Sequence, residues 1–385
     1  MSTQDILLRT QTILPWFLQH LEQLVLVESP SEDPAAVNAA QELTAGWAEA
    51  LGARVKRHRQ KNFGDVYELR FAPKSSRATA ARPRRKPILL LGHLDTVWPH
   101  GTLKSMPWRN QAGKLSGPGV LDMKAGVVMA LAAVSVLRDL NLLRPVTLLL
   151  VSEEEIGSPV SRPITERLAK ESSAVFVLEP AQGLALKTAR KGVGHYDLHV
   201  TGIGAHSGVD FERGHSAVLE LARQIERISA FTDLSRGLTV NCGVISGGTR
   251  SNVIAAEAHA EIDVRIARAS DEARVARLLR SLKPIDPACR LTVTGGLNRP
   301  PMERKAGTIA LFKQAKKLAA DLGFQLDEAS TGGGSDGNFT AALGIPTLDG
   351  MGAIGAGAHA AHEHILTEHI VPRTALLTAM LAAVD

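Results

Sequence analysis

Cysteine and aromatic residues are scarce in this sequence. Its 385 residues include only two cysteines, Cys242 and Cys289, and aromatic side chains make up 4% of the chain. Two cysteines cannot build a disulfide framework or a cysteine-rich zinc site, so the protein is neither disulfide-rich nor folded around such a zinc site. The same scarcity fits a reducing compartment, and we expect a cytoplasmic location.

Targeting and membrane-spanning segments are lacking as well. Residues 1–30 carry Asp5, Arg9 and Glu22 among their apolar positions, and no basic start leads into an apolar run, so we expect no signal peptide. No apolar run approaches the length of a transmembrane helix, and we expect no membrane partner. With 44% hydrophobic and 22% charged residues, the composition is typical of a globular protein, and the length suggests two or three domains.

The net charge of +5 arises largely in one segment, residues 54–86. Basic segments of this kind occur in nucleic-acid-binding patches. The most basic part of this one has no aromatic residues among its charges, and residues 74–83 have the Ser/Ala/Arg/Pro composition of a loop between strands. We therefore favour a solvated loop over a nucleic-acid site and expect no nucleic-acid partner.

Short apolar runs and longer periodic segments predict an α/β fold. Buried strands are expected at residues 88–91, 146–151 and 175–178, and helices at residues 4–27, 35–51, 124–140 and 303–322. Residues 188–296 follow a different order, strand, helix, strand, strand, helix, strand, which is the pattern of a ferredoxin-like βαββαβ unit. We therefore predict a first domain formed by residues 1–187 and 299–385, with a mixed, mostly parallel sheet, and an α+β domain inserted at residues 188–298.

Each of the predicted buried strands ends in residue types that bind metals. His93 and Asp95 follow the first, Glu153 and Glu154 the second and Glu179 the third. Because ligands bind at the carboxyl ends of strands in open α/β sheets, we expect these side chains to converge. Asp122 is expected to join them, since it follows a glycine-rich turn at the start of a helix.

These residues, together with one late histidine, form a nitrogen and oxygen ligand set that suits zinc, with cobalt or manganese as alternatives. Two histidines and three carboxylates exceed what one tetrahedral zinc requires and match two metals that share a carboxylate and a water. Adjacent Glu153 and Glu154 would point to opposite sides of an extended chain, so that one can ligate while the other acts as a base. His359, His362 and His364 are all candidates for the late histidine.

Several motifs in this order resemble the M20 family of co-catalytic zinc peptidases and deacylases, most closely its glutamate carboxypeptidase (carboxypeptidase G2-like) branch. The resemblance covers nearly the whole chain. It rests on these stretches: Gly92-His93-Leu94-Asp95-Thr96-Val97, Gly119-Val120-Leu121-Asp122-Met123-Lys124, Ser152-Glu153-Glu154-Glu155-Ile156-Gly157-Ser158, Leu178-Glu179-Pro180, Ala205-His206-Ser207-Gly208, Ser251-Asn252-Val253-Ile254, Asp263-Val264-Arg265 and Gly334-Ser335-Asp336.

The resemblance implies a role for each metal-site residue. His93, Asp122 and Glu179 would bind one zinc, and Asp122, Glu154 and His359 the other, with Asp122 bridging. His359 is preferred because the family pattern has a glutamate, here Glu363, four residues after its histidine. Asp95 would orient His93, and Glu153 would be the general base.

The resemblance also assigns roles within the inserted domain and near the chain's second glycine-rich loop. His206 would polarise the scissile carbonyl from across a homodimer, and Arg265 would clamp a substrate carboxylate in a bidentate pair. Asn252 and the backbone at Gly333 and Gly334 would help to hold the substrate. The inserted domain would serve as the dimerisation and lid domain of a zinc-peptidase-like fold.

We therefore predict a dinuclear zinc hydrolase, with two Zn²⁺ per subunit, that cleaves an amide bond beside a carboxylate in a small peptide or an N-acyl amino acid. The enzymatic alternative is an N-acyl-amino-acid deacylase of the acetylornithine or succinyl-diaminopimelate type, which shares the same ligands. Two further alternatives belong to other classes: a catalytically silent peptide- or metal-binding protein on the same scaffold, and a basic nucleic-acid binder.

Overall fold

The computed structural model describes residues 2–73 and 85–384, and these divide into two compact units. Unit 1 contains residues 1–189, 304–330 and 335–385, and unit 2 contains residues 190–303 and 331–334. The boundaries predicted from the sequence, 187/188 and 298/299, differ from the observed ones by a few residues. The prediction also leaves residues 331–334 in the first domain, whereas they belong to unit 2. The predicted basic loop at residues 74–83 lies outside the described residues.

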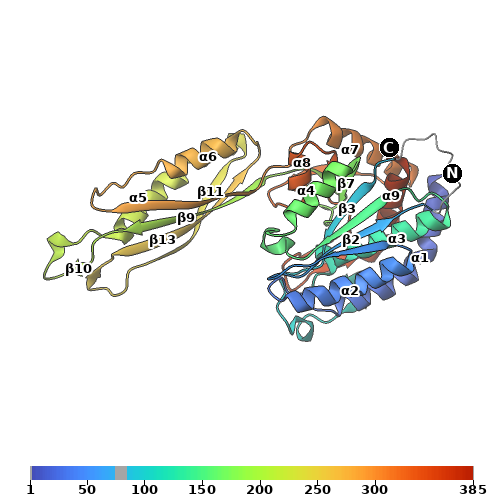
Figure 1. The fold of residues 1–385 in the computed structure, drawn as a ribbon, viewed down its shortest axis with the longest axis horizontal. Helices are drawn as coiled ribbons and strands as arrows, with labels where there is room; N and C mark the ends of the chain where they lie inside the picture. Colours follow the sequence, from blue (N-terminus) through green and yellow to red (C-terminus); the bar gives the residue numbers. More distant parts are fainter. Residues whose placement is uncertain (1, 74–84, 385) are drawn as a thin grey trace. The chain divides into compact units, whose positions relative to one another are not determined.

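Unit 1 is built on a six-stranded sheet with the order β1-β2-β6-β3-β7-β16 (Figure 1). The four strands from β6 to β16 are parallel, and β2 and β1 continue the sheet in antiparallel fashion. Their bounds are β1 Arg54–His58, β2 Val66–Phe71, β3 Ile88–His93, β6 Val146–Val151, β7 Ala174–Val177 and β16 Thr347–Leu348. The predicted α/β fold with a mixed, mostly parallel sheet is confirmed.

Helices cover both faces of this sheet (Figure 1). The larger core lies between one face and five helices: α1 Thr3–Val25, α2 Pro34–Ala50, α3 Ala125–Asp139, α7 Ala306–Asp321 and α9 Ile370–Ala383. A smaller apolar cluster joins the other face to α4 Arg162–Glu171, which contacts the short α8 Gly337–Ala342. Because both faces are covered, every residue of β3 is buried, as parallel strands with helices on both sides require.

Helix α3 corrects one expectation about apolar length. Residues 120–139 are long and apolar enough to cross a membrane, although no such run was expected from the sequence. Most of this segment is buried inside unit 1, where α3 packs against α1, α9 and β3. A helix that is apolar on all sides is what the centre of a layered core requires.

Gly126 in α3 allows the helix to approach the end of β7 closely. A Cβ atom at this position would lie 2.1 Å from the carbonyl oxygen of Leu178. Any side chain here would therefore push α3 away from the strand end that carries Glu179. In this way a small residue in the helix determines where a predicted metal ligand lies.

A second, four-stranded sheet joins distant segments of unit 1. Its order is β17-β18-β5-β4, with bounds β4 Arg109–Gln111, β5 Lys114–Ser116, β17 Gly355–Ala356 and β18 His364–Leu366. The pairing of β18 with β5 brings the segment of the late histidines beside the turn that leads to Asp122. Two further strands of the chain, β8 Ala185–Arg190 and β15 Asp327–Thr331, pair with each other.

Unit 2 has the element order that the sequence predicted. Its antiparallel sheet has the order β11-β13-β9-β14, and α5 and α6 pack on one face of it. The bounds are β9 Gly192–Thr201, α5 Ala217–Ser229, β11 Thr239–Gly247, β13 Glu257–Ile266, α6 Asp271–Arg280 and β14 Arg290–Arg299, with a short pair β10 Ala205–His206 and β12 Val253–Ile254. Alternate residues of β13 are buried, as expected for a sheet with one face against helices.

Acids of unit 1 neutralise part of the basic segment at residues 54–86. Glu68 on β2 is 1% exposed, and its carboxylate pairs with His58, Arg70 and Arg167. Burial alone would raise the pKa of Glu68, but hydrogen bonds from these three side chains lower it to about 2. The described part of this segment is thus partly engaged in ion pairs, and the absence of a nucleic-acid partner stays a prediction.

Candidate active site and metal centre

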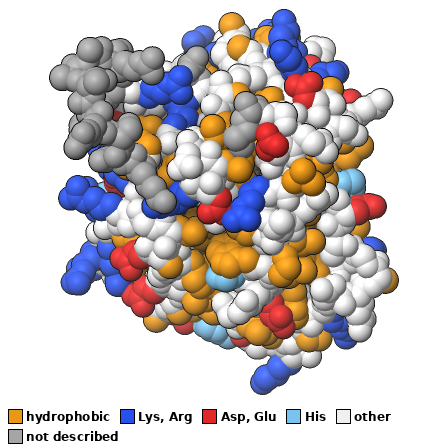
Figure 2. All heavy atoms as spheres, turned by 90° about the vertical axis from the view of Figure 1, so that its right-hand side faces the viewer, with side chains coloured by type: hydrophobic (Ala, Val, Ile, Leu, Met, Phe, Trp, Pro, Cys, Tyr) orange, Lys and Arg blue, Asp and Glu red, His pale blue; other side chains and the backbone are white. Residues whose placement is uncertain are grey.

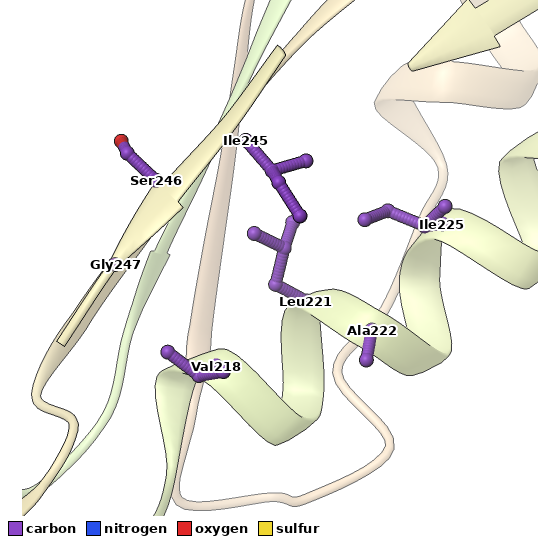
Figure 3. Close-up of a pocket in the computed structure, with 7 residues that line it drawn as sticks. All are labelled: Val218, Leu221, Ala222, Ile225, Ile245, Ser246 and Gly247. Carbon is purple, nitrogen blue, oxygen red and sulfur yellow. The ribbon is translucent and has the colours of Figure 1, made fainter. Parts of the chain in front are cut away.

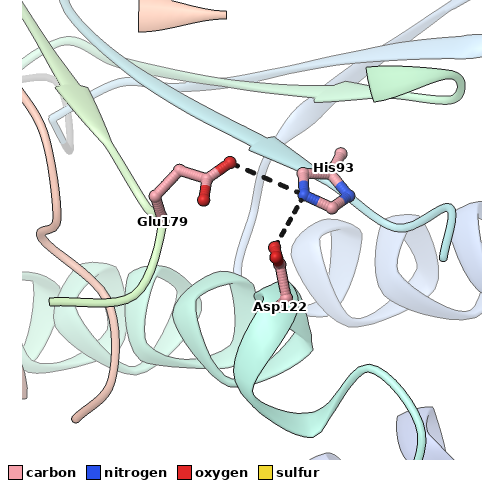
Figure 4. A group of neighbouring side chains, drawn as sticks. All are labelled: His93, Asp122 and Glu179. Carbon is pink, nitrogen blue, oxygen red and sulfur yellow. Dashed lines mark hydrogen bonds and ion pairs between the residues drawn. The ribbon is translucent and has the colours of Figure 1, made fainter. Parts of the chain in front are cut away.

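His93 lies at the carboxyl end of β3 and is 1% exposed. Its Nδ1 is 2.9 Å from the backbone carbonyl oxygen of Asp95, which fixes the tautomer and leaves Nε2 to face the site. Nε2 lies 3.1 Å from Asp122 Oδ1 and 3.7 Å from Glu179 Oε1 (Figure 4). Figure 4 shows both carboxylates pointing at one imidazole nitrogen, so the three side chains surround one point.

A second group forms on the other side of Asp122. His359 Nε2 lies 3.2 Å from Glu155 Oε1 and 3.4 Å from Asp122 Oδ2. Asp122 therefore presents one carboxylate oxygen to His93 and the other to His359. Among the described residues, these two triads are the groups of histidines and acids whose ligand atoms all lie within 4.8 Å of one another.

Hydrogen bonds between the histidines and the acids shift the pKa values of both. Burial would lower the pKa of His93, but its bonds to Asp122, Asp95 and Glu179 raise that pKa well above its ordinary value. Bonds to Asp122 and Glu155 raise the pKa of His359 to about 10. Burial would raise the pKa of Asp122, but the two histidines hold it well below its usual range. A cation bound in either triad would compete with a proton for the histidine nitrogen, so metal binding would release protons.

The donor set fits two zinc ions. Each triad offers one imidazole nitrogen and two carboxylates, and Asp122 belongs to both. Three protein ligands with a further open position are typical of catalytic zinc, and imidazole with carboxylate is a set that zinc accepts. His362 and His364 are in neither triad. His364 Nδ1 lies 2.8 Å from the backbone carbonyl oxygen of His362.

The structure corrects the roles predicted for Glu153 and Glu154. Glu153 is fully buried, and its carboxylate accepts hydrogen bonds from the Ser152 hydroxyl and from the backbone N–H groups of Val160 and Ser161, at 2.6, 3.0 and 2.6 Å. It is held inside the fold and is not available as a general base. In the place predicted for Glu154, beside Asp122 and His359, the structure has the side chain of Glu155.

The physical reason for this shift by one residue is a turn. The prediction assumed that the extended chain of β6 continues through the acidic run, so that side chains alternate between two sides. The strand instead ends at Val151, and Glu154–Ile156 form a 3-10 turn. Glu154 then lines a small cavity with His93, Glu179 and Asp336. A run of three glutamates does not show by itself which of them faces Asp122 and His359.

Asp95 orients His93 through its backbone carbonyl more directly than through its side chain. Its carbonyl oxygen accepts the bond from His93 at 2.9 Å, while the nearer carboxylate oxygen is 3.4 Å from the same nitrogen. The carboxylate accepts hydrogen bonds from the backbone N–H groups of Glu154 and Glu155, both at 3.1 Å, and from the Ser31 hydroxyl at 2.7 Å. Asp95 therefore fixes the 3-10 turn as well as the orientation of His93.

The remaining predicted residues belong to unit 2 and form two groups there. His206 ends β10, its Nδ1 accepts a bond from the N–H of Gly208 at 3.1 Å, and it is exposed. Asn252 lies next to it, since its backbone carbonyl accepts the N–H of Ser207 at 3.0 Å. In the absence of a substrate contact, the roles assigned to these two residues stay predictions.

The second group of unit 2 surrounds the glycine-rich loop. Arg265 pairs with Asp263 at 2.9 Å and donates to the carbonyl of Gly332 at 3.3 Å. The carbonyls of Gly333 and Gly334 accept bonds from a different arginine, Arg190, at 3.2 and 2.9 Å. Arg265 and this loop are thus neighbours, which is compatible with joint binding of a substrate.

A family model provides the decisive comparison. Peptidase family M20/M25/M40 matches residues 89–383, which include all five members of the two triads. The chain belongs to this family. The predicted membership in the M20 family of metallopeptidases is therefore confirmed.

Individual relatives of this M20 chain agree with that assignment. Carboxypeptidase G2 from Pseudomonas sp. (strain RS-16) is 28% identical over 374 residues, covering 95% of this chain and 88% of the relative. Aminopeptidase PepT from Bacillus cereus ATCC 10987 superimposes with a TM-score of 0.79 at 21% identity, covering 96% of this chain and 98% of that one. The M20 family metallo-carboxypeptidase Sso-CP2 from Sulfolobus solfataricus has a TM-score of 0.70 at 16% identity, covering 95% and 98%. The two structures show a shared fold, and the first relative is a carboxypeptidase.

Proposed function

We propose that this M20 protein is a dinuclear zinc hydrolase that cleaves an amide bond beside a substrate carboxylate. The observation that carries the proposal is the position of Asp122, whose two carboxylate oxygens face two histidines of separate triads. A structural carboxylate has no need of such an arrangement, whereas a pair of cations that share one ligand does.

Within this mechanism, Glu154 is the general base. Two zinc ions bound in the triads would lower the pKa of a water between them and polarise the scissile carbonyl. The Glu154 carboxylate, which lines the cavity beside His93 and Glu179, accepts a proton from the attacking water and returns it to the leaving nitrogen. Glu155, the next residue, would hold the second zinc, so that one turn would supply both a ligand and a base.

The substrate class proposed here is a small peptide or an N-acyl amino acid, with release of a C-terminal amino acid such as glutamate. The carboxypeptidase G2 relative supports this choice over most of the chain. Arg265, beside the glycine-rich loop, supplies the planar cation that a substrate carboxylate requires. His206 and Asn252 are proposed as substrate-binding residues of unit 2, as the M20 resemblance implies.

An activity panel tests the proposal. The chain, loaded with zinc, cobalt or manganese, is assayed against peptides ending in glutamate, N-acyl amino acids, N-acetylornithine and N-succinyl-diaminopimelate, each with and without a chelator. We expect chelator-sensitive hydrolysis and a preference for the glutamate peptides. A preference for the last two compounds would indicate a deacylase, and two bound zinc ions with no turnover on any compound would indicate a silent binding protein.

We also propose that unit 2 is a ferredoxin-like lid domain that forms a homodimer. Strand β11 is an edge strand, and it forms an apolar groove with α5 (Figure 3). The groove is lined by Val218, Leu221, Ala222, Ile225, Ile245, Ser246 and Gly247, and Ile245 is 62% exposed. An edge strand beside an apolar helix face can pair with its own copy across a two-fold axis.

The dimer is tested by molar mass in solution. We expect the parent chain to have twice the mass of one chain in light scattering, and Ile245→Lys to have the mass of one chain. A parent that remains monomeric and fully active on dilution would contradict this part of the proposal.

A further inference from the structure

Glu363 is a buried carboxylate in unit 1 that belongs to neither metal triad, and it is 1% exposed. Oε1 accepts hydrogen bonds from the backbone N–H groups of Leu121 and Asp122, at 2.8 and 3.1 Å. Oε2 accepts bonds from the N–H of Gly119 and from the Trp98 indole Nε1, both at 2.9 Å. Four donors, three of them from the backbone that leads into Asp122, thus converge on one carboxylate.

The same residue is tied to the other side of the metal centre by a tight turn. The N–H of Glu363 donates to the carbonyl of Ala360 at 2.9 Å, and the N–H of Ala360 donates to the carbonyl of Gly357 at 2.8 Å. His359 lies within this turn, in a left-handed backbone conformation with φ of 61°. The Glu363 carboxylate therefore joins the turn that carries His359 to the loop that carries Asp122.

The two residues joined in this way are ligands of one triad. His359 Nε2 lies 3.4 Å from Asp122 Oδ2, and their backbones come from segments more than 200 residues apart in the chain. Of the two, His359 is half exposed, so packing alone holds it weakly. A fixed distance between these ligands requires a connection between their two loops. The three bonds to Glu363 from the backbone N–H groups of the Asp122 loop supply it.

We propose that Glu363 is a positioning residue that sets the geometry of the second cation position, formed by Asp122, Glu155 and His359. The inference rests on the proposed function only in assuming that a second cation binds there. Glu363 touches neither substrate nor cation. It acts through the backbone of Asp122 and through the turn around His359.

The hydrogen-bond donors around the Glu363 carboxylate make Glu363→Gln a sharp test. All four partners of the carboxylate are N–H donors, and none of them is a hydroxyl that can turn and accept. The amide nitrogen of glutamine must therefore face two donors in either orientation, although its size and shape are those of glutamate. The variant changes hydrogen-bond polarity and little else.

Zinc affinity is measured on the full chain by competition with a chromogenic chelator, in the absence of substrate. We expect the parent to bind two zinc ions, and Glu363→Gln to bind the weaker of them about 10- to 100-fold less tightly. Affinity for the tighter zinc should remain within a few-fold of the parent. Glu368→Gln is the matched control, because the Glu368 side chain is 76% exposed and should leave both affinities unchanged.

Equal zinc affinities in parent and Glu363→Gln would overturn the inference. This includes the case in which the zinc-free variant has a lower melting temperature but binds both zinc ions as tightly as the parent. A parent that binds one zinc would overturn both this inference and the dinuclear mechanism. A parent that binds two zinc ions but hydrolyses no substrate would refute the proposed function alone. If Glu363→Gln does not fold, Glu363→Asp decides: it keeps the charge but shortens the side chain by one methylene, which pulls the carboxylate away from the three N–H groups of the Asp122 loop, and unchanged affinity for the weaker zinc would overturn the inference.

Discussion

The three consecutive glutamates after β6 give the sharpest prediction, because the same substitution should have three different effects. Glu154→Gln removes the proposed base and leaves both triads intact. We expect kcat to fall about 100- to 10,000-fold, the range for loss of a positioned general base. Zinc stoichiometry should stay at the parent value, since Glu154 belongs to neither triad.

Glu153→Gln should act on stability. Its carboxylate accepts bonds from Ser152 on one oxygen and from the N–H groups of Val160 and Ser161 on the other. The amide nitrogen fits best toward Ser152, whose hydroxyl can turn to accept, so that only the Ser152 N–H loses its partner. One unpaired buried donor costs about 1–3 kcal/mol. This corresponds to a melting temperature lower by roughly 2–12 °C, with kcat nearly unchanged.

Glu155→Gln should act on metal content. Loss of one carboxylate from the triad with Asp122 and His359 should leave one tightly bound zinc instead of two. The three variants are compared by kcat with zinc in excess, by zinc stoichiometry after dialysis and by thermal melting. If Glu153→Gln abolished turnover at full zinc content while Glu155→Gln behaved like the parent, the register of the acidic run in the structure would be refuted.

Three further outcomes are expected. His359→Ala should lose one zinc equivalent on dialysis, whereas His362→Ala should retain both, and the reverse result would place the late ligand elsewhere. Gly126→Ala should lower the melting temperature and weaken zinc binding, because its Cβ would lie 2.1 Å from the Leu178 carbonyl oxygen; a variant that melts like the parent would contradict this close approach. Glu68, with its pKa lowered from 4.5 to about 2, contributes stability that is fully present above pH 4.5 and is lost as the pH falls through 2. The melting temperature of Glu68→Gln should therefore decrease less than that of the parent when the pH is lowered from about 5 toward 2. An equal decrease in both proteins would show that Glu68 does not cause the loss of stability in acid.

Much of the site could be predicted because its ligands lie next to features that local sequence specifies. Apolar runs bounded by polar residues identify β3, β6 and β7, and parallel strands place His93 and Glu179 at one edge of the sheet. The glycine-rich turn before α3 places Asp122 at the same edge. The chain's own motifs then identify the M20 family, which the family model confirms.

The sequence by itself determined the fold class, the kind of ligands and the family, because strand periodicity and ligand chemistry are local properties of the chain. Only the tertiary structure decided which of three adjacent glutamates lies beside Asp122 and His359. That choice depends on where β6 ends and on N–H groups held by Asp95, a residue from another strand end. The same is true of Glu363, whose four donors, three from the loop that leads into Asp122 and one from Trp98, lie more than 200 residues earlier in the chain. Such contacts have no local signature, since they exist only after distant segments have packed together.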